Sequence, residues 1–237
     1  MNLKNAVCVV TGATEGIGRA IAEALAKKGG QVAICSRTTA KVTTAVAEMR
    51  ARELSVVGTH ADVSVEADVE RFRNFVHAEL GPVDVIVNNA GLGHFAPIDE
   101  LTVAQFDETM AINVRGVFLV TRAFLPDMRK RKSGEIVNIA SLAGKNAFLD
   151  GTAYSASKHA VLGFSKTLML EVRKDNIRVI AICPGSVDTP FFGKAGETLK
   201  HADRVLTADD VAQAVVATLE LPGRAMISEL DIRPTNP

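Results

Sequence analysis

The sequence predicts an α/β fold in which helices cover both faces of a doubly wound parallel sheet of about seven strands. Three observations support this prediction. Short apolar runs alternate with amphipathic stretches of helical period along the chain. A glycine-rich turn joins the first apolar run to the first helical stretch. No linker, repeat or low-complexity segment interrupts the 237 residues, so we expect one domain spanning 1–237.

The apolar runs are the predicted strands. They are Ala6–Val10, Gln31–Cys35, Ser55–Thr59, Val83–Asn88, Gly134–Ala140, Ile177–Cys183 and Met226–Ile232. Short, mostly apolar runs are typical of strands covered on both faces. The helical stretches between them supply the right-handed crossovers that parallel neighbours require.

Each predicted helix carries its apolar residues on one face. Repeats at helical spacing are Ile17, Ile21 and Leu25, then Val42, Val46 and Met49, then Val65, Val69, Phe72 and Val76. The segment Thr207–Asp210 has the pattern of a capping box and predicts the start of a late helix.

Composition argues against several classes of protein. Lys+Arg and Asp+Glu both number 27, so no net field attracts nucleic acid or an anionic membrane. The basic run Arg129–Lys132 is more typical of a solvated helix end than of a nuclear signal. Cys8, Cys35 and Cys183 lie in apolar runs, which indicates buried thiols. With no signal peptide or membrane span recognised, we expect a cytoplasmic protein.

The glycine-rich turn Thr11–Gly18 has the spacing G-x-x-x-G-x-G. Glycines allow the backbone to approach a pyrophosphate, and a helix N-terminus directs amide groups toward it. We therefore predict a dinucleotide site of the Rossmann type, although glycines can also serve packing alone. The predicted contacts in this turn are Gly12, Thr14, Glu15, Gly16, Ile17 and Gly18.

The residues after the second strand favour NADP(H), with NAD(H) as the alternative. A site for NAD usually places an acid here to hold the ribose 2′-hydroxyl. This chain has Ser36 and Arg37 instead, and a guanidinium can pair with a 2′-phosphate. Two considerations oppose this interpretation, because Arg37 can be a solvated loop residue and Glu15 adds negative charge nearby.

Two further strand ends are expected to complete the cofactor site. Asp62, with Val63 beside it, can accept a hydrogen bond from the adenine amino group or can stabilise a turn. After the fourth strand, Asn89, Ala90 and Gly91 offer small side chains and an amide that braces neighbouring strands.

Ser141, Tyr154 and Lys158 form the predicted catalytic group. Tyr154 is the only tyrosine of the chain, and Lys158 follows it by one helical turn. A nearby ammonium would lower the pKa of the phenol toward the working range of an acid–base catalyst. Ser141, after the fifth strand, would polarise the substrate oxygen.

Taken together, these motifs resemble the shorter branch of the short-chain dehydrogenase/reductase family. The segments TGATEGIG, NNAG and YSASK, with Asn113, Ser141 and Pro184-Gly185, occur in that family's order from Leu3 to about Pro190. The extended branch of sugar epimerases carries a G-x-x-G-x-x-G turn, which this chain lacks.

The resemblance implies a role for each matching residue. Tyr154 would be the general acid/base, and Lys158 would lower its pKa and bind the nicotinamide ribose. Asn113 would hold a water in a proton relay to Lys158. The residues expected around the nicotinamide are Pro184, Gly185 and Val187, with Thr189 bonding its carboxamide.

The substrate region is less specific. The resemblance implies a short lid over about residues 189–206. We expect an apolar pocket suited to a ketone, aldehyde or acyl chain. Its predicted wall comprises His94 with its neighbour Phe95, Ala143, Phe148, Phe191 and Phe192, beside Ser141 and Tyr154.

The leading hypothesis is an NADPH-dependent carbonyl reductase. The alternatives are an NAD-dependent alcohol dehydrogenase and a regulator that binds NADP(H) without catalysis. We expect a small-molecule substrate and no metal, because the five histidines lack metal spacing. A homodimer or homotetramer is expected, with Val117, Phe118, Leu162 and Phe164 near the interface.

Overall fold

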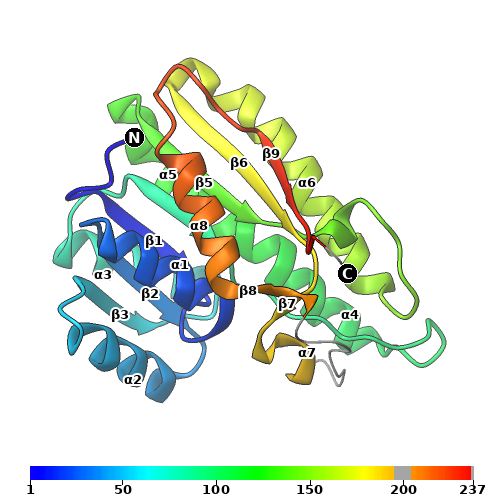
Figure 1. Ribbon diagram of the computed structural model, residues 1–237. Coiled ribbons are helices and arrows are strands. Elements are labelled where there is room, and N and C mark those ends of the chain that lie inside the picture. The colour runs from blue at the N-terminus through cyan, green and yellow to red at the C-terminus, as the bar shows by residue number, and fades with distance from the viewer. Residues whose placement is uncertain (195–203, 236–237) are drawn as a thin grey trace.

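A computed structural model describes residues 1–194 and 204–235. Seven strands form one parallel sheet in the order β3-β2-β1-β4-β5-β6-β9 (Figure 1). Their bounds are β1 Val7–Thr11, β2 Gln31–Ser36, β3 Val56–His60, β4 Val85–Asn88, β5 Gly134–Ile139, β6 Ile177–Pro184 and β9 Glu229–Ile232. All seven predicted strands are therefore confirmed, each to within a few residues.

Helices pack on both faces of the sheet (Figure 1). One face is covered by α1 (Gly16–Lys27), α2 (Thr39–Arg50) and α8 (Ala208–Leu219), whose apolar residues join one core cluster. The other face is covered by α3 (Glu66–Glu79), α5 (Gly116–Arg131) and α6 (Thr152–Val172), around a second cluster. The helix α4 (Val103–Met110) lies between β4 and α5 in the chain.

The helical periods predicted from the sequence match these buried faces, with one exception. Val65 is exposed and stands just before α3, which begins at Glu66. The predicted capping box is confirmed, because Thr207 accepts from the amide of Asp210 and the Asp210 carboxylate accepts from the amide of Thr207.

The strand order reverses between β1 and β4, which creates the crevice where doubly wound sheets bind ligands. From β1 the chain winds outward to β3, then returns to β4 and winds the other way. The carboxyl ends of the parallel strands lie at this edge, and the segments after β1 to β6 carry most of the predicted site residues.

Two features of this edge were not predicted. A π-helical turn, Ala111–Arg115, interrupts the passage from α4 to α5. A second, two-stranded sheet pairs β7 (Val187–Asp188) with β8 (Leu206–Thr207), and the short helix α7 (Pro190–Lys194) follows β7. This small sheet joins the two ends of the predicted lid, of which residues 195–203 lie outside the described part.

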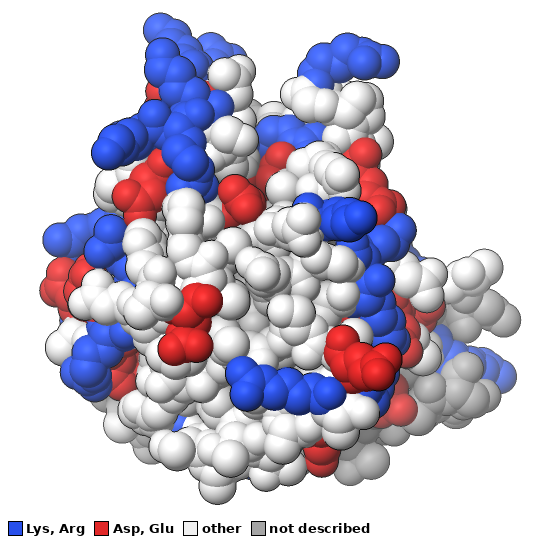
Figure 2. All heavy atoms as spheres, turned by 90° about the vertical axis from the view of Figure 1, so that its left-hand side faces the viewer, with Lys and Arg blue, Asp and Glu red and all other residues white. Residues whose placement is uncertain are grey.

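The face drawn in Figure 2 agrees with the balanced charge of the chain. Figure 2 shows lysine and arginine beside aspartate and glutamate around an uncharged central area. Within the described ranges, no helix has the length and apolarity needed to cross a membrane. The three cysteines are free and buried, as predicted, and burial raises the pKa of each thiol.

Candidate active site

A single cleft of about 1040 Å³ collects most of the predicted site residues. Nearly all the predicted cofactor residues line it, from the glycine turn through Ser36, Arg37 and Val63 to Thr189. The predicted substrate residues His94, Ala143, Phe148 and Phe191 line it as well. Of the other predictions, Asp62 and Asn113 do not line the cleft, and the side chain of Phe192 lies outside the described residues.

The glycine turn needs its glycines at this place. Gly12 and Gly16 have φ of 63° and 57°, where side chains are disfavoured. A Cβ on Gly12 would lie 2.8 Å from the Cα of Ala90. The Asn89 amide donates to the carbonyl oxygens of Thr11 and Gly12 at 3.0 Å, so the asparagine motif holds the turn in position.

These features fit a dinucleotide. The first turn of α1, Gly16, Ile17 and Gly18, lines the cleft, so the amide groups of this helix end are placed to bind an anion. The same cleft continues from Arg37 beyond β2 to Ser141 and Tyr154 beyond β5, the ends expected for the adenosine and the nicotinamide. The residues present therefore suit NAD(P)(H).

Three of the four predicted catalytic residues, Ser141, Tyr154 and Lys158, come together at the end of the cleft expected for the nicotinamide. Ser141 follows β5 and accepts from the amide of Ala143 at 3.1 Å, which orients its hydroxyl. It also hydrogen-bonds with Tyr154, in the first turns of α6. The Lys158 side chain, one turn further and 5% exposed, places Nζ 5.6 Å from the centre of the Tyr154 ring.

The pKa values in this arrangement differ from the sequence-based expectation. Burial raises the pKa of Tyr154 to about 12, and the hydrogen bond with Ser141 only partly opposes this. The Lys158 ammonium donates to the carbonyl oxygen of Ile139 at 2.9 Å. Burial lowers the pKa of Lys158 to about 8. In this arrangement burial therefore outweighs the lowering expected from Lys158, and the phenol keeps its proton at neutral pH.

Asn113 occupies the π-helical turn behind these residues. Its Nδ2 donates to the carbonyl oxygen of Leu92 at 2.8 Å and to Ser157 Oγ at 2.9 Å, while its Oδ1 accepts from the amide of Leu92. Such π-helical turns often mark functional sites. A Cβ on Gly91 would lie 3.3 Å from Asn113 Oδ1 and 3.7 Å from Lys158 Nζ. The asparagine therefore lies near the lysine and holds the segment after β4.

The adenosine end carries two ion pairs. Arg37 pairs with Glu108 at 3.0 Å, and Lys41 pairs with Glu15 at 3.2 Å. All four side chains line the cleft. Asp62 instead accepts from the amide and hydroxyl of Ser64, which corresponds to the predicted turn role. Its contact with adenine stays a prediction.

Aromatic rings form the substrate side of the cleft. Phe95 and Phe191 each lie 5.6 Å from Tyr154 between ring centres, and Phe148 lies 6.4 Å away. The predicted apolar wall thus surrounds the phenol. His94 lines the same region and pairs with Glu108 at 2.9 Å.

Several cleft residues were missed by the sequence reasoning. Among them are Lys41, Leu92, Glu108, Leu142, Asn146, Arg204 and Arg233-Pro234 near the end of the chain. Most of them belong to no sequence motif. They lie at the cleft because the fold brings their helix or loop there. Glu108 offered only a weak signal, its position about one turn before Asn113 on a helical stretch.

Known proteins match this chain along most of its length. The family model for short chain dehydrogenases matches residues 6–200. A sepiapterin reductase of Chlorobaculum tepidum is 34% identical over 237 residues, covering 97% of this chain and 96% of that protein.

Two solved structures are similar in fold and in sequence. An alcohol dehydrogenase from the archaeon Thermococcus sibiricus, complexed with 5-hydroxy-NADP, is 33% identical with a TM-score of 0.89, covering 97% of each chain. An actinorhodin polyketide ketoreductase with NADPH is also 33% identical with a TM-score of 0.89, covering 97% of this chain and 96% of that one. These matches confirm the Rossmann-type fold predicted above. The chain belongs to the short-chain dehydrogenase family of oxidoreductases.

Proposed function

We propose that this protein reduces the carbonyl group of a ketone, aldehyde or 3-oxoacyl compound with NADPH. One observation carries the proposal. Ser141 and Tyr154 line the cleft and hydrogen-bond with each other, and Lys158 is buried beside them. Two hydroxyl donors that meet at one point can both bond to a carbonyl oxygen placed there. The phenol holds its proton at neutral pH, as a proton donor must.

NADPH, when bound, supplies the hydride. Ser141 would hold the carbonyl oxygen, and Tyr154 would donate its proton to that oxygen as negative charge develops. Lys158 would face the nicotinamide ribose and stabilise the phenolate that remains. Asn113, close to Lys158, would support the return of a proton from solvent.

The aromatic wall indicates the kind of substrate. Phe95, Phe148 and Phe191 surround Tyr154, so the group attached to the carbonyl would be apolar, either a ring or an acyl chain. The test is NADPH oxidation across a panel of cyclic ketones, aldehydes and 3-oxoacyl thioesters, with NADH in parallel. Turnover of any member with NADPH supports the proposal. Tight NADPH binding without turnover across the panel would favour the regulator instead.

The cofactor preference rests on Arg37 at the adenosine end. The two solved relatives hold cofactors of the NADP type, which supports the choice. An NAD-dependent dehydrogenase is the second candidate, and the pairing of Arg37 with Glu108 is the observation that favours it.

We expect Arg37→Ala to weaken NADPH binding by about 10-fold and NADH binding by less than about twofold, since charge-assisted hydrogen bonds contribute about 1.5–3 kcal/mol when buried and less at exposed sites. Fluorescence titration of both cofactors measures the ratio. If Arg37→Ala weakens the binding of NADPH and of NADH by the same factor, Arg37 does not bind the 2′-phosphate.

The assembly and location complete the proposal. We infer that the protein is a homodimer or homotetramer and that it is located in the cytoplasm. Each chain would form a single domain with a substrate lid over about residues 189–206. Of the residues expected near an interface, Val117 and Leu162 are buried in the core and Phe164 packs partly against it, whereas Phe118 is 46% exposed. Three buried thiols suit a reducing compartment. A monomeric mass by light scattering would contradict the assembly.

A further inference from the structure

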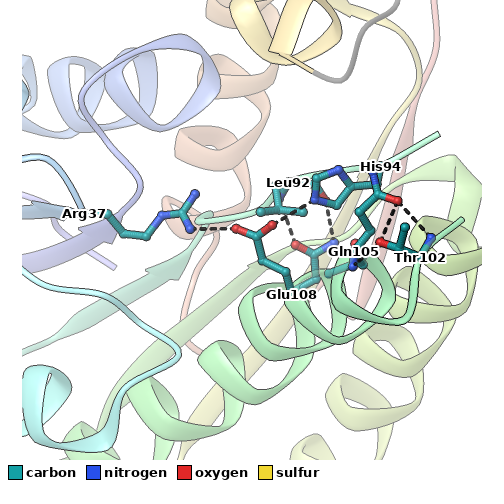
Figure 3. Close-up of polar contacts among 8 residues, drawn as sticks. Arg37, Leu92, His94, Thr102, Gln105 and Glu108 are labelled. Carbon is teal, nitrogen blue, oxygen red and sulfur yellow. Dashed lines mark hydrogen bonds and ion pairs between the residues drawn. The ribbon is translucent and has the colours of Figure 1, made fainter.

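The contact between Arg37 and Glu108 connects the part of the cleft proposed for the adenosine with the part proposed for the substrate. Arg37 follows β2 at the adenosine end, and Glu108 lies in the last turn of α4. Figure 3 shows Arg37 reaching the Glu108 carboxylate from one side, with His94 on its other side. The two contacts measure 3.0 Å to Arg37 and 2.9 Å to His94. One carboxylate therefore engages both the cofactor end and the substrate end of the cleft.

Glu108 is held in place by its helix. The start of α4 is fixed by a capping box, in which Thr102 accepts from the amide of Gln105 and the Gln105 side chain accepts from the amide of Thr102 (Figure 3). The π-helical turn with Asn113 follows α4 directly. These contacts fix the backbone of α4, and the hydrogen bond with His94 is a second contact of the Glu108 carboxylate besides Arg37.

The charges around the adenosine end cancel in pairs. The cations Arg37 and Lys41 are each within 3.2 Å of a carboxylate, from Glu108 and Glu15. Hydrogen bonds from His94 and Arg37 lower the pKa of Glu108, so its carboxylate is ionised at neutral pH. A 2′-phosphate that approaches Arg37 therefore meets a cation already engaged, with a negative charge next to it.

We propose that Glu108 is a specificity-determining residue that competes with the 2′-phosphate for Arg37 and reduces the preference for NADPH over NADH. This inference rests on the proposed role of Arg37 at the 2′-phosphate. NADH, which lacks that phosphate, leaves the pair between Arg37 and Glu108 intact. The ratio of the affinities for NADPH and NADH is therefore smaller than it would be if Arg37 had no carboxylate partner.

The test measures binding of the adenosine halves, independent of catalysis. Calorimetry with adenosine 2′,5′-bisphosphate and with 5′-AMP compares the parent with Glu108→Gln, Arg37→Ala and the double variant. Glu66→Gln is the matched control, because Glu66 also forms an exposed ion pair, with Arg122 at 2.9 Å, but does not line the cleft. Thermal unfolding establishes that each variant is folded.

We expect Glu108→Gln to tighten binding of the bisphosphate by about two- to fivefold, within the range of exposed charge pairs, and to change the affinity for 5′-AMP by less than about twofold. Glu66→Gln should change neither. When Arg37→Ala is already present, adding Glu108→Gln should change the affinity for the bisphosphate by less than half as much as it does in the parent protein.

Three results would overturn the proposal in distinguishable ways. If Glu108→Gln leaves bisphosphate binding unchanged or weaker while Arg37→Ala weakens it, Glu108 does not compete, and the proposed role of Arg37 stands. If Glu108→Gln tightens both ligands equally, its effect is not specific to the 2′-phosphate. If Arg37→Ala leaves the ratio of the two ligands unchanged, the role of Arg37 fails together with that of Glu108.

Discussion

Tyr154→Phe should reduce the rate of carbonyl reduction by about 10²- to 10⁴-fold, the range expected when a general acid is removed. The variant loses only the phenolic hydroxyl. Its ring can keep the edge-on contact with Phe95 and the tilted contact with Phe191. Single-turnover kinetics with NADPH would measure the effect, using the best substrate from the panel.

The loss should fall on the chemical step. The affinity for NADPH should change by less than about twofold, since the hydroxyl bonds to Ser141 and is proposed to contact the substrate. Ser141→Ala serves as the comparison, because it removes one of the two donors and keeps the acid. A Tyr154→Phe variant that retains more than about a tenth of the rate would remove Tyr154 from its proposed role.

Arg178→Leu should lower the free energy of unfolding by about 3–5 kcal/mol, the cost of leaving a buried charge without its partner. Arg178 is 6% exposed and donates from Nε to both oxygens of Glu135 at 2.8 Å. It also donates to the carbonyl oxygens of Leu219 and Ala225. The guanidinium therefore joins β5 and β6 to the end of α8. Urea unfolding at constant pH would measure the change.

The destabilisation should depend on pH. Burial already raises the pKa of Glu135 above its usual 4.5, and removal of Arg178 should raise it further. The folded variant would then bind more protons than the unfolded chain, so its stability falls as pH rises above 4.5. The deficit relative to the parent should thus be smaller at acidic pH than at neutral pH.

Two further variants test whether the loss of stability in Arg178→Leu comes from the buried ion pair. Arg122→Leu breaks the exposed pair with Glu66 and should cost less than about 1 kcal/mol. Glu135→Leu combined with Arg178→Leu should recover part of the loss, because no lone buried charge remains. A single Arg178→Leu variant no less stable than Arg122→Leu would show that the buried pair contributes little.

The elements that could be predicted from the sequence are those with local signals. The strands were found because mostly apolar runs mark a sheet covered on both faces. The turn at Gly12 was found because its closely spaced glycines stand between the first apolar run and the first helical stretch. Ser141, Tyr154 and Lys158 were placed together because parallel strand ends and the following helix share one edge.

The features that escaped prediction arise from tertiary placement. Glu108 reaches Arg37 only because α4 returns to the edge of the sheet, and no periodicity encodes that approach. The direction of Lys158 Nζ toward Ile139 also escaped prediction, since i, i+4 spacing fixes a helix face and leaves the side-chain rotamer open. Charge alone suggested a lowered pKa for Tyr154, whereas burial proved to be the larger effect.

The aromatic cluster around Tyr154 has a consequence for spectroscopy. The chain has one tyrosine and no tryptophan, and its ten other aromatic rings are phenylalanines. The tyrosine fluorescence of the whole protein, and its absorbance at wavelengths longer than the phenylalanine bands, therefore originate at the proposed proton donor. Ionisation of that phenol, or arrival of a ligand among the surrounding rings, would alter the bulk optical signal without any introduced label.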